Sequence, residues 1–92
     1  MADNTKALID LSKAITLNPS DSELYSARAA VYMNLDLPSK AIGDYTQVIL
    51  LEPSNFEAFF QRGKLNRSIT DLDMAIQLNP NCASAYLARA NV

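Results

Sequence analysis

Residues 41–63 read AIGDYTQVILLEPSNFEAFFQRG, and this block decides the fold because it recurs twice more in the chain. Residues 7–29 read ALIDLSKAITLNPSDSELYSARA, and residues 68–90 read SITDLDMAIQLNPNCASAYLARA. Recurrence of one short unit is typical of repeat proteins, in which each unit packs only against its neighbours. The sequence therefore predicts a stack of similar units.

Each block predicts two helices separated by a proline turn. Apolar residues recur at helical spacing ahead of the proline. Proline has no amide donor and disfavours helical geometry in the residue before it, so the first helices should end near Asn18, Glu52 and Asn79. The second helices should begin at polar capping residues. The capping candidates are Ser20, Asp21, Ser54, Asn55 and Asn81.

The apolar stripes of the first helices and one aromatic residue of each second helix are expected to form the core. Aromatic residues at helical spacing are far more often packing residues than part of a cofactor site. The expected core residues are Leu11, Ile15, Tyr45, Ile49, Leu72, Ile76, Tyr25, Phe59 and Tyr86.

The blocks resemble the tetratricopeptide repeat. The first two blocks are offset by 34 residues, the helix after the proline is rich in alanine, and the helix before it closes with LNP or LEP. A departure is the arginine that replaces the family's leucine in every copy, at Arg28, Arg62 and Arg89. The resemblance covers essentially the whole chain. It implies an all-α fold, a right-handed superhelical stack of antiparallel helix hairpins (an α-solenoid).

If the two helices of a family repeat are named A and B, the chain should run B-A-B-A-B-A as a single domain over 1–92. Residues 4–18 would form a B helix without its A helix, and residues 22–53 a complete repeat. Residues 54–80 would form a shortened repeat, and residues 81–92 an A helix without its B helix. This order of helices is expected either for a segment of a longer array or for a chain whose boundaries are shifted by half a repeat.

The second connection between blocks is seven residues shorter than the first. It reads KLNR, whereas the first reads AVYMNLDLPSK. In one solution the A and B helices each lose about a turn and remain a hairpin, with Gly63 capping A and Asn66 or Ser68 capping B. In the other, residues 56–78 form one continuous helix. Its two apolar sides would point in nearly opposite directions and would need a second chain, as in a swapped dimer. We favour the hairpin.

Three aspartates and three arginines also repeat. Asp10, Asp44 and Asp71 occupy one block position, and Arg28, Arg62 and Arg89 follow them by 18 residues in each copy. We hypothesise that each aspartate pairs across the proline turn with the arginine of the next A helix, which would join consecutive repeats. The alternative is that both groups face solvent, where such pairs contribute little.

Composition argues against several classes of function. The formal charge is −2, and the 8 basic and 10 acidic residues are interspersed, so no basic stripe indicates nucleic-acid binding. No apolar run approaches the roughly 20 residues of a membrane-spanning helix, and the N-terminus is polar. We expect a cytoplasmic protein without a membrane or nucleic-acid partner.

Catalytic chemistry is also not indicated. The chain contains no histidine, and its carboxylates are scattered rather than paired. Cys82 is the only cysteine, which excludes an internal disulfide and a multi-cysteine metal cluster. A helix start could lower the pKa of its thiol, but a tolerated small residue is the favoured interpretation. We expect no enzyme activity, no cofactor and no metal.

By resemblance, the chain should be a protein–protein interaction scaffold that holds a peptide or a partner helix in a concave groove lined by A helices. The best-known version of this groove binds chaperone C-terminal tails through lysine, asparagine and arginine side chains. The matching positions here hold Ser26, Ala30, Gln61, Ser84 and Ala88, so we expect chaperone tails not to be partners. The full set of matching groove positions is Glu23, Ser26, Ala30, Met33, Asn34, Glu57, Phe60, Gln61, Lys64, Ser84, Leu87, Ala88 and Asn91.

A different class of function remains open. The terminal helices carry no polar cap, so the chain could be a self-assembling structural element, either a swapped dimer or a head-to-tail oligomer. A scaffold should stay monomeric without its peptide, whereas a self-assembling element should gain mass with concentration. Light scattering across a dilution series distinguishes the two.

Overall fold

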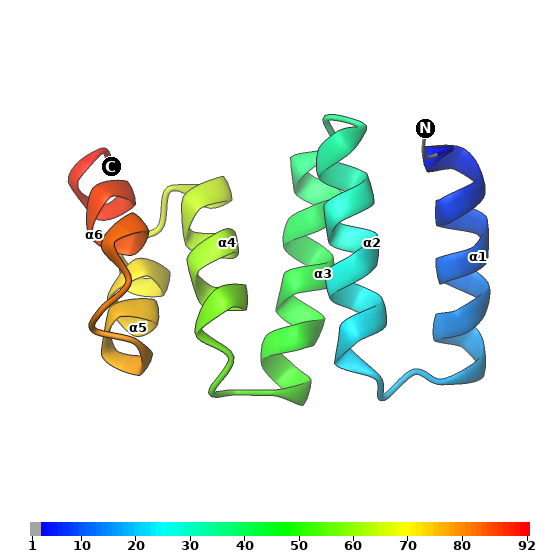
Figure 1. Ribbon diagram of the computed structural model, residues 1–92, viewed down its shortest axis with the longest axis horizontal. Helices are drawn as coiled ribbons and strands as arrows, with labels where there is room; N and C mark the ends of the chain where they lie inside the picture. Colours follow the sequence, from blue (N-terminus) through cyan, green and yellow to red (C-terminus); the bar gives the residue numbers. More distant parts are fainter. Residues whose placement is uncertain (1–2) are drawn as a thin grey trace.

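The computed structural model describes residues 3–92, and these residues form α-helices without a strand. The helices line up along the long axis of a molecule that measures 36 × 25 × 20 Å, with the two termini at opposite ends (Figure 1). Each helix packs chiefly on the one before and the one after it in sequence. The predicted all-α solenoid is therefore observed. The helices are α1 (Asn4–Leu17), α2 (Ser22–Asn34), α3 (Pro38–Leu51), α4 (Phe56–Asn66), α5 (Ile69–Leu78) and α6 (Ala83–Ala90).

The proline turns end the B helices where the sequence predicts. The C-terminal caps of α1, α3 and α5 are Asn18, Glu52 and Asn79, each directly before a proline. Among the following A helices, α2 and α4 begin after Asp21 and Asn55, whose side chains accept backbone hydrogen bonds. The third A helix differs from the prediction. Its capping position is Cys82, one residue after Asn81, and no side chain caps it.

The short connection forms a hairpin. Helix α4 ends at Asn66, Arg67 adopts the left-handed conformation with φ 55°, and Ser68 begins α5 by accepting a hydrogen bond from the Asp71 amide at 3.2 Å. Residues 56–78 are therefore not one continuous helix, and the predicted hairpin is confirmed. The shortening by seven residues is distributed unequally over the two helices and the turn that connects them. Helix α4 is two residues shorter than α2, α5 is four residues shorter than α3, and the connection is one residue shorter.

The predicted role of Gly63 as a helix cap is wrong. Gly63 lies inside α4, which continues for three more residues. A Cβ atom at this position would lie 2.9 Å from the Cβ of Asp71 and 3.0 Å from the Cγ of Leu72. The glycine therefore allows α4 and α5 to approach each other closely, which is a packing role rather than a turn role.

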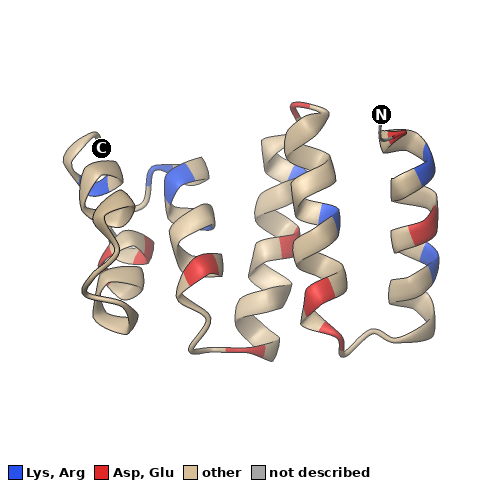
Figure 2. Cartoon of the chain, in the orientation of Figure 1, with Lys and Arg blue, Asp and Glu red and all other residues tan. Residues whose placement is uncertain are grey.

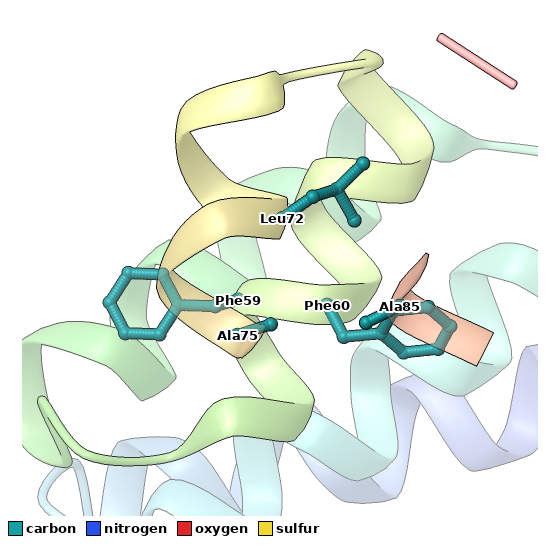
Figure 3. Close-up of a cluster of buried hydrophobic side chains, with 5 residues drawn as sticks. All are labelled: Phe59, Phe60, Leu72, Ala75 and Ala85. Carbon is teal, nitrogen blue, oxygen red and sulfur yellow. The ribbon is translucent and has the colours of Figure 1, made fainter. Parts of the chain in front are cut away.

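The core consists of two adjoining clusters. One contains Tyr25, Val48 and Ala58, and the other lies between α4, α5 and α6 (Figure 3). The second cluster is formed by Phe59, Phe60, Leu72, Ala75 and Ala85.

Most of the expected core residues are at least partly buried. Tyr25, Phe59 and Leu72 are buried, whereas Leu11, Ile15, Tyr45, Ile49 and Ile76 are partly buried. Tyr86 is the exception at 42% exposed, because no other helix of residues 3–92 covers that side of α6. None of the described helices combines the length and the apolar character required to cross a bilayer.

Candidate functional site

A pocket lies between the A helices α4 and α6, which contact each other directly. It has a volume of about 240 Å³. Helix α4 contributes Lys64 and the connection contributes Arg67, while α6 and the residues after it supply the opposite wall. The pocket is lined by Lys64, Arg67, Leu87, Ala88, Asn91 and Val92.

Local structure fixes the two cations at this pocket. Arg67 adopts the left-handed conformation in the turn between α4 and α5, and its Nη2 donates to the backbone oxygen of Asn91 at 3.1 Å. The Nζ of Lys64 lies 5.0 Å from the centre of the Phe60 ring, within range of a cation–π contact. Both side chains remain exposed, and no acidic residue lines the pocket. The pocket is therefore suited to a ligand that carries negative charge.

Apolar groups complete the pocket. Leu87 is 64% exposed and Val92 is 46% exposed, so both offer carbon surface to a ligand. A positive rim beside apolar side chains is suited to an acidic peptide that also carries a branched side chain. Sequence reasoning identified Lys64 and Leu87 but missed Arg67 and Val92. Arg67 lies just after the end of α4, at its C-terminal cap, and the family resemblance assigns no groove position there.

The expected groove residues differ in how much surface they present. Phe60 is buried in the core at 8% exposed, so the expectation that it lines an open groove is wrong. Its ring packs with Ala85 of α6, which closes the space between the two A helices at that level (Figure 3). Ser26, Gln61 and Ala88 are partly buried. The exposed positions are Glu23, Ala30, Met33, Asn34, Glu57, Lys64, Ser84, Leu87 and Asn91.

The repeated arginines hold partners other than those hypothesised. Arg28 donates from Nε and Nη2 to the two carboxylate oxygens of Asp44, at 2.9 and 2.7 Å. Arg62 holds Asp71 in the same two-pronged way, at 2.8 Å for both bonds. Each pair therefore joins an A helix to the B helix that follows it. The hypothesis that Asp44 pairs with Arg62, and Asp71 with Arg89, across the proline turn is wrong.

The third guanidinium nitrogen, Nη1, does make a hydrogen bond to the B helix on the other side of the proline turn. Nη1 of Arg28 donates to Ser12 Oγ at 3.3 Å, and Nη1 of Arg62 donates to Thr46 Oγ1 at 3.2 Å. Nη1 of Arg89 donates to Asp73 Oδ1 at 2.9 Å. The three acceptors share one block position, two residues after the repeated aspartate. Arg28 and Arg62 thus each tie three consecutive helices together.

These contacts are strengthened by burial of the carboxylates. Asp44 and Asp71 are 4% and 6% exposed. The hydrogen bonds that Arg28 donates to Asp44 raise the pKa of Arg28 above its usual value, and those that Arg62 donates to Asp71 do the same for the pKa of Arg62. Asp10, in contrast, is exposed and has no ion-pair partner within residues 3–92, so its hypothesised pair with Arg28 does not form.

The remaining charged residues form no face of a single sign. Basic and acidic positions alternate along α1 and are scattered over the other helices (Figure 2). Cys82 is partly buried and packs against the cluster of α4, α5 and α6. In the described part of the chain, no three His, Cys, Asp or Glu side chains are grouped so that they could hold a metal ion.

Comparison with known proteins agrees with this architecture. A family described as "TPR repeat", the tetratricopeptide repeat, matches residues 57–92. Serine/threonine-protein phosphatase 5 of Rattus norvegicus is 28% identical over 92 residues, which cover 92% of this chain and 18% of the phosphatase. Tetratricopeptide repeat protein 13 of Homo sapiens is 32% identical over 88 residues, which cover 88% of this chain and 10% of that protein. The chain thus spans less than a fifth of these curated relatives.

Solved structures share the fold. The Arabidopsis OM64 TPR domain has a TM-score of 0.86 and 26% identity, and the match covers 96% of this chain and 78% of that domain. The second TPR domain of human RPAP3, in complex with the HSP70 peptide SGPTIEEVD, has a TM-score of 0.84 and 26% identity, with 96% and 79% covered. The first TPR of Spaghetti (RPAP3), bound to the HSP90 peptide SRMEEVD, has a TM-score of 0.87 at 21% identity, with 96% and 75% covered.

These complexes correct the expectation about chaperone tails. Two of the domains with this fold hold HSP90 and HSP70 peptides, which conflicts with the exclusion of such tails as partners. The exclusion rested on Ser26, Ala30, Gln61, Ser84 and Ala88 lacking charge. It took no account of Lys64 and Arg67, which the hairpin brings beside α6.

Proposed function

Because this chain belongs to the tetratricopeptide repeat family, we propose that it is a protein-interaction scaffold that holds a short acidic peptide between α4 and α6. The observation that carries this proposal is the pairing of Lys64 and Arg67 with the exposed Leu87 and Val92 around one pocket. The two cations would hold carboxylates of the peptide. The apolar wall would hold a neighbouring aliphatic side chain.

The neighbouring complexes support this class of ligand. The peptides in the two RPAP3 domains, SRMEEVD and SGPTIEEVD, both end in two glutamates, a valine and an aspartate. Such an end combines clustered negative charge with one branched apolar side chain. This is the chemistry that the pocket offers in complementary form, since two cationic side chains and no Asp or Glu side chain line it.

The proposal can be tested with a fluorescent peptide of sequence SRMEEVD. Binding is followed by anisotropy for the unchanged chain and for the Lys64→Glu and Lys6→Glu variants. Both variants alter the net charge equally, but Lys6 lies on exposed α1 and does not line the pocket. Reversing a charge that directly faces a carboxylate should raise the Kd about fivefold to tenfold for Lys64→Glu, and far less for Lys6→Glu.

A second peptide tests the role of charge. SRMQQVN with an amidated C-terminus keeps the length and the valine but removes the carboxylates, and it should bind markedly more weakly. Equal binding of the two peptides, or equal loss of affinity in the two lysine variants, would show that the pocket between α4 and α6 is not the binding site.

A further inference from the structure

A second hollow lies between α1 and the C-terminal part of α2, and it shares no residue with the pocket at Lys64 and Arg67. It has a volume of about 530 Å³, and α1 forms one wall of it over about two turns. None of its residues belongs to the groove positions expected for a peptide. This α1–α2 hollow is lined by Leu8, Ile9, Ser12, Lys13, Thr16 and Tyr32.

The Ile9 side of α1 is a face that stays exposed in the other copies of the block as well. Ile9 corresponds to Gly43 of α3 and to Thr70 of α5. Lys13 corresponds to Gln47 of α3. All five residues are exposed, although α3 and α5 each have a helix packed on both sides. The exposure of this face therefore comes from its position on the B helix and does not depend on the place of α1 in the row.

Helix α1 differs from the other copies by its apolar side chain on this face. Ile9 is 65% exposed, at a position where α3 and α5 carry glycine and threonine. Leu8, which also lines the α1–α2 hollow, is partly buried. Exposed aliphatic side chains that line a hollow are a feature of surfaces that bind apolar groups of a partner. The hollow therefore offers apolar contact that the same face of α3 or α5 lacks.

The aromatic residue of the hollow, Tyr32, is held between two cations. The centre of its ring lies 5.7 Å from the guanidinium carbon of Arg28 and 5.9 Å from Nζ of Lys40, both within range of a cation–π contact. Arg28 is itself fixed by its hydrogen bonds to Asp44 and Ser12. The Tyr32 ring is therefore a positioned flat surface against which a partner side chain can pack.

The charged groups at the α1–α2 hollow are cations. Lys13 on its wall and Lys40 over the tyrosine ring are exposed and form no ion pair within residues 3–92. The two hydroxyls on the wall already have partners, since Ser12 Oγ accepts from Arg28 at 3.3 Å and Thr16 Oγ1 donates to the backbone oxygen of Ser12 at 3.0 Å. Among the described residues, no Asp or Glu side chain lines the hollow. The charge of the site therefore favours carboxylates.

We propose that the α1–α2 hollow docks an acidic amphipathic helix of a partner protein. Its aliphatic side chains would pack on Ile9 and Tyr32, and its carboxylates would lie at Lys13 and Lys40. The charge of the partner follows from complementarity to these two cations. The occupant is a helix because the α1 wall is a helix face about two turns long, on which a second helix can set side chains three and four residues apart. This surface is separate from the pocket at Lys64, so the chain could hold two ligands at once.

A helical probe peptide tests the proposal. Its sequence, ELAELLAELAELLAE, places leucines on one face and glutamates beside them, and a fluorescein label allows binding to be followed by anisotropy. We expect saturable binding to the unchanged chain. The same peptide with every glutamate replaced by lysine should bind at least about tenfold more weakly, because its charge then opposes Lys13 and Lys40.

Two pairs of variants locate the binding site of the probe. Ile9→Ser and Leu50→Ser remove aliphatic side chains of similar exposure, 65% and 68%, but only Ile9 lines the hollow. Lys13→Glu and Lys64→Glu change the net charge equally, but only Lys13 lines the hollow. Ile9→Ser and Lys13→Glu should each raise the Kd of the probe about fivefold or more, and the two control variants less than about twofold. All four positions are exposed, so circular dichroism should show unchanged helical content.

Absence of saturable binding up to about 1 mM chain would overturn the proposal, and so would equal binding of the glutamate and lysine peptides. Equal losses of affinity in both members of either pair would also overturn it. Self-association that Ile9→Ser abolishes in light scattering would assign the α1–α2 hollow to a second copy of the chain instead. Lys13→Glu should leave the SRMEEVD titration unchanged, because Lys13 does not line the pocket at Lys64 and Arg67. The two proposals can therefore fail separately.

Discussion

The hydroxyl of Tyr25 donates to the backbone oxygen of Pro19 at 3.0 Å, which ties the second helix of the block back to its own proline turn. Tyr86 makes the same contact with Pro80, also at 3.0 Å. The middle block carries Phe59 at this position, six residues after Pro53, and a phenyl ring has no group to donate. The molecule therefore contains two copies of a turn contact and one place where it is missing.

The Phe59→Tyr variant should supply the missing contact. Its hydroxyl would reach the oxygen of Pro53 by the geometry already present in the other two blocks. We expect a gain of about 0.5–1.5 kcal/mol in the free energy of unfolding, measured by urea denaturation. Tyr25→Phe should lose a similar amount. A loss of stability in Phe59→Tyr would mean that the middle turn does not share the geometry of the other two.

The two glycines should respond in opposite directions to alanine. Gly43 is an exposed residue inside α3, and a Cβ atom there would meet nothing within 4 Å. Gly43→Ala should therefore stabilise the chain by about 1 kcal/mol. Gly63→Ala would force its Cβ against Asp71 and Leu72, and it should destabilise by about 1–3 kcal/mol. Thermal unfolding of the two variants provides the comparison, and a stabilising Gly63→Ala would contradict the close approach of α4 and α5.

Asp44 and Asp10 occupy the same block position but should contribute differently to the free energy of unfolding. Asp44→Asn keeps the size of the side chain but removes the charge that receives both bonds from Arg28. Because the Arg28 side chain is 21% exposed and partly screened by water, we expect a loss of about 1–2 kcal/mol. Asp10→Asn should change stability by no more than about 0.5 kcal/mol. Urea denaturation at low protein concentration separates these values from self-association, and equal losses would refute the difference.

Replacing Arg67, the residue with a left-handed backbone conformation between α4 and α5, by glycine should raise the free energy of unfolding. Arg67 has φ 55°, a conformation that costs an L-residue roughly 1–2 kcal/mol and a glycine almost nothing. Part of this gain is offset by the lost hydrogen bond to Asn91 and by the greater freedom of glycine in the unfolded chain. Arg67→Gly should therefore raise the free energy of unfolding by about 0.5–1 kcal/mol. A net loss in calorimetry would mean that the contact with Asn91 outweighs the strain.

The sequence predicts the helices well because their ends are set locally. Proline determines the ends at Asn18, Glu52 and Asn79 through backbone geometry that depends on adjacent residues alone. The hairpin over the short connection is also local, since Ser68 can cap α5 only if the helix before it has ended. The extent of α4 was not predictable in the same way, because Gly63 fits both a helix cap and a tight helix crossing.

The pairing of aspartates with arginines on neighbouring helices was harder to predict, because spacing in the sequence does not show which of two neighbouring helices an arginine faces. The spacing of 18 residues between aspartate and arginine is constant, yet the pairs that form are 16 residues apart for Arg28 and Asp44 and 9 residues apart for Arg62 and Asp71. The shortened connection makes the true spacing irregular. A constant spacing of 16 does connect each arginine to its Nη1 acceptor, at Ser12, Thr46 and Asp73, and that regularity was available from the sequence.

Packing between helices that are neighbours in sequence also has a consequence for how the chain folds and unfolds. Contacts that are local in sequence form with little loss of chain entropy, so the chain should fold rapidly. Local unfolding should begin at α1, since α1 has no buried residue whereas α3 has Ala41, Asp44 and Val48. In a hydrogen-exchange experiment at low protein concentration, the amides of α1 should therefore exchange through local fraying, and those of α3 only when most of the stack has come apart.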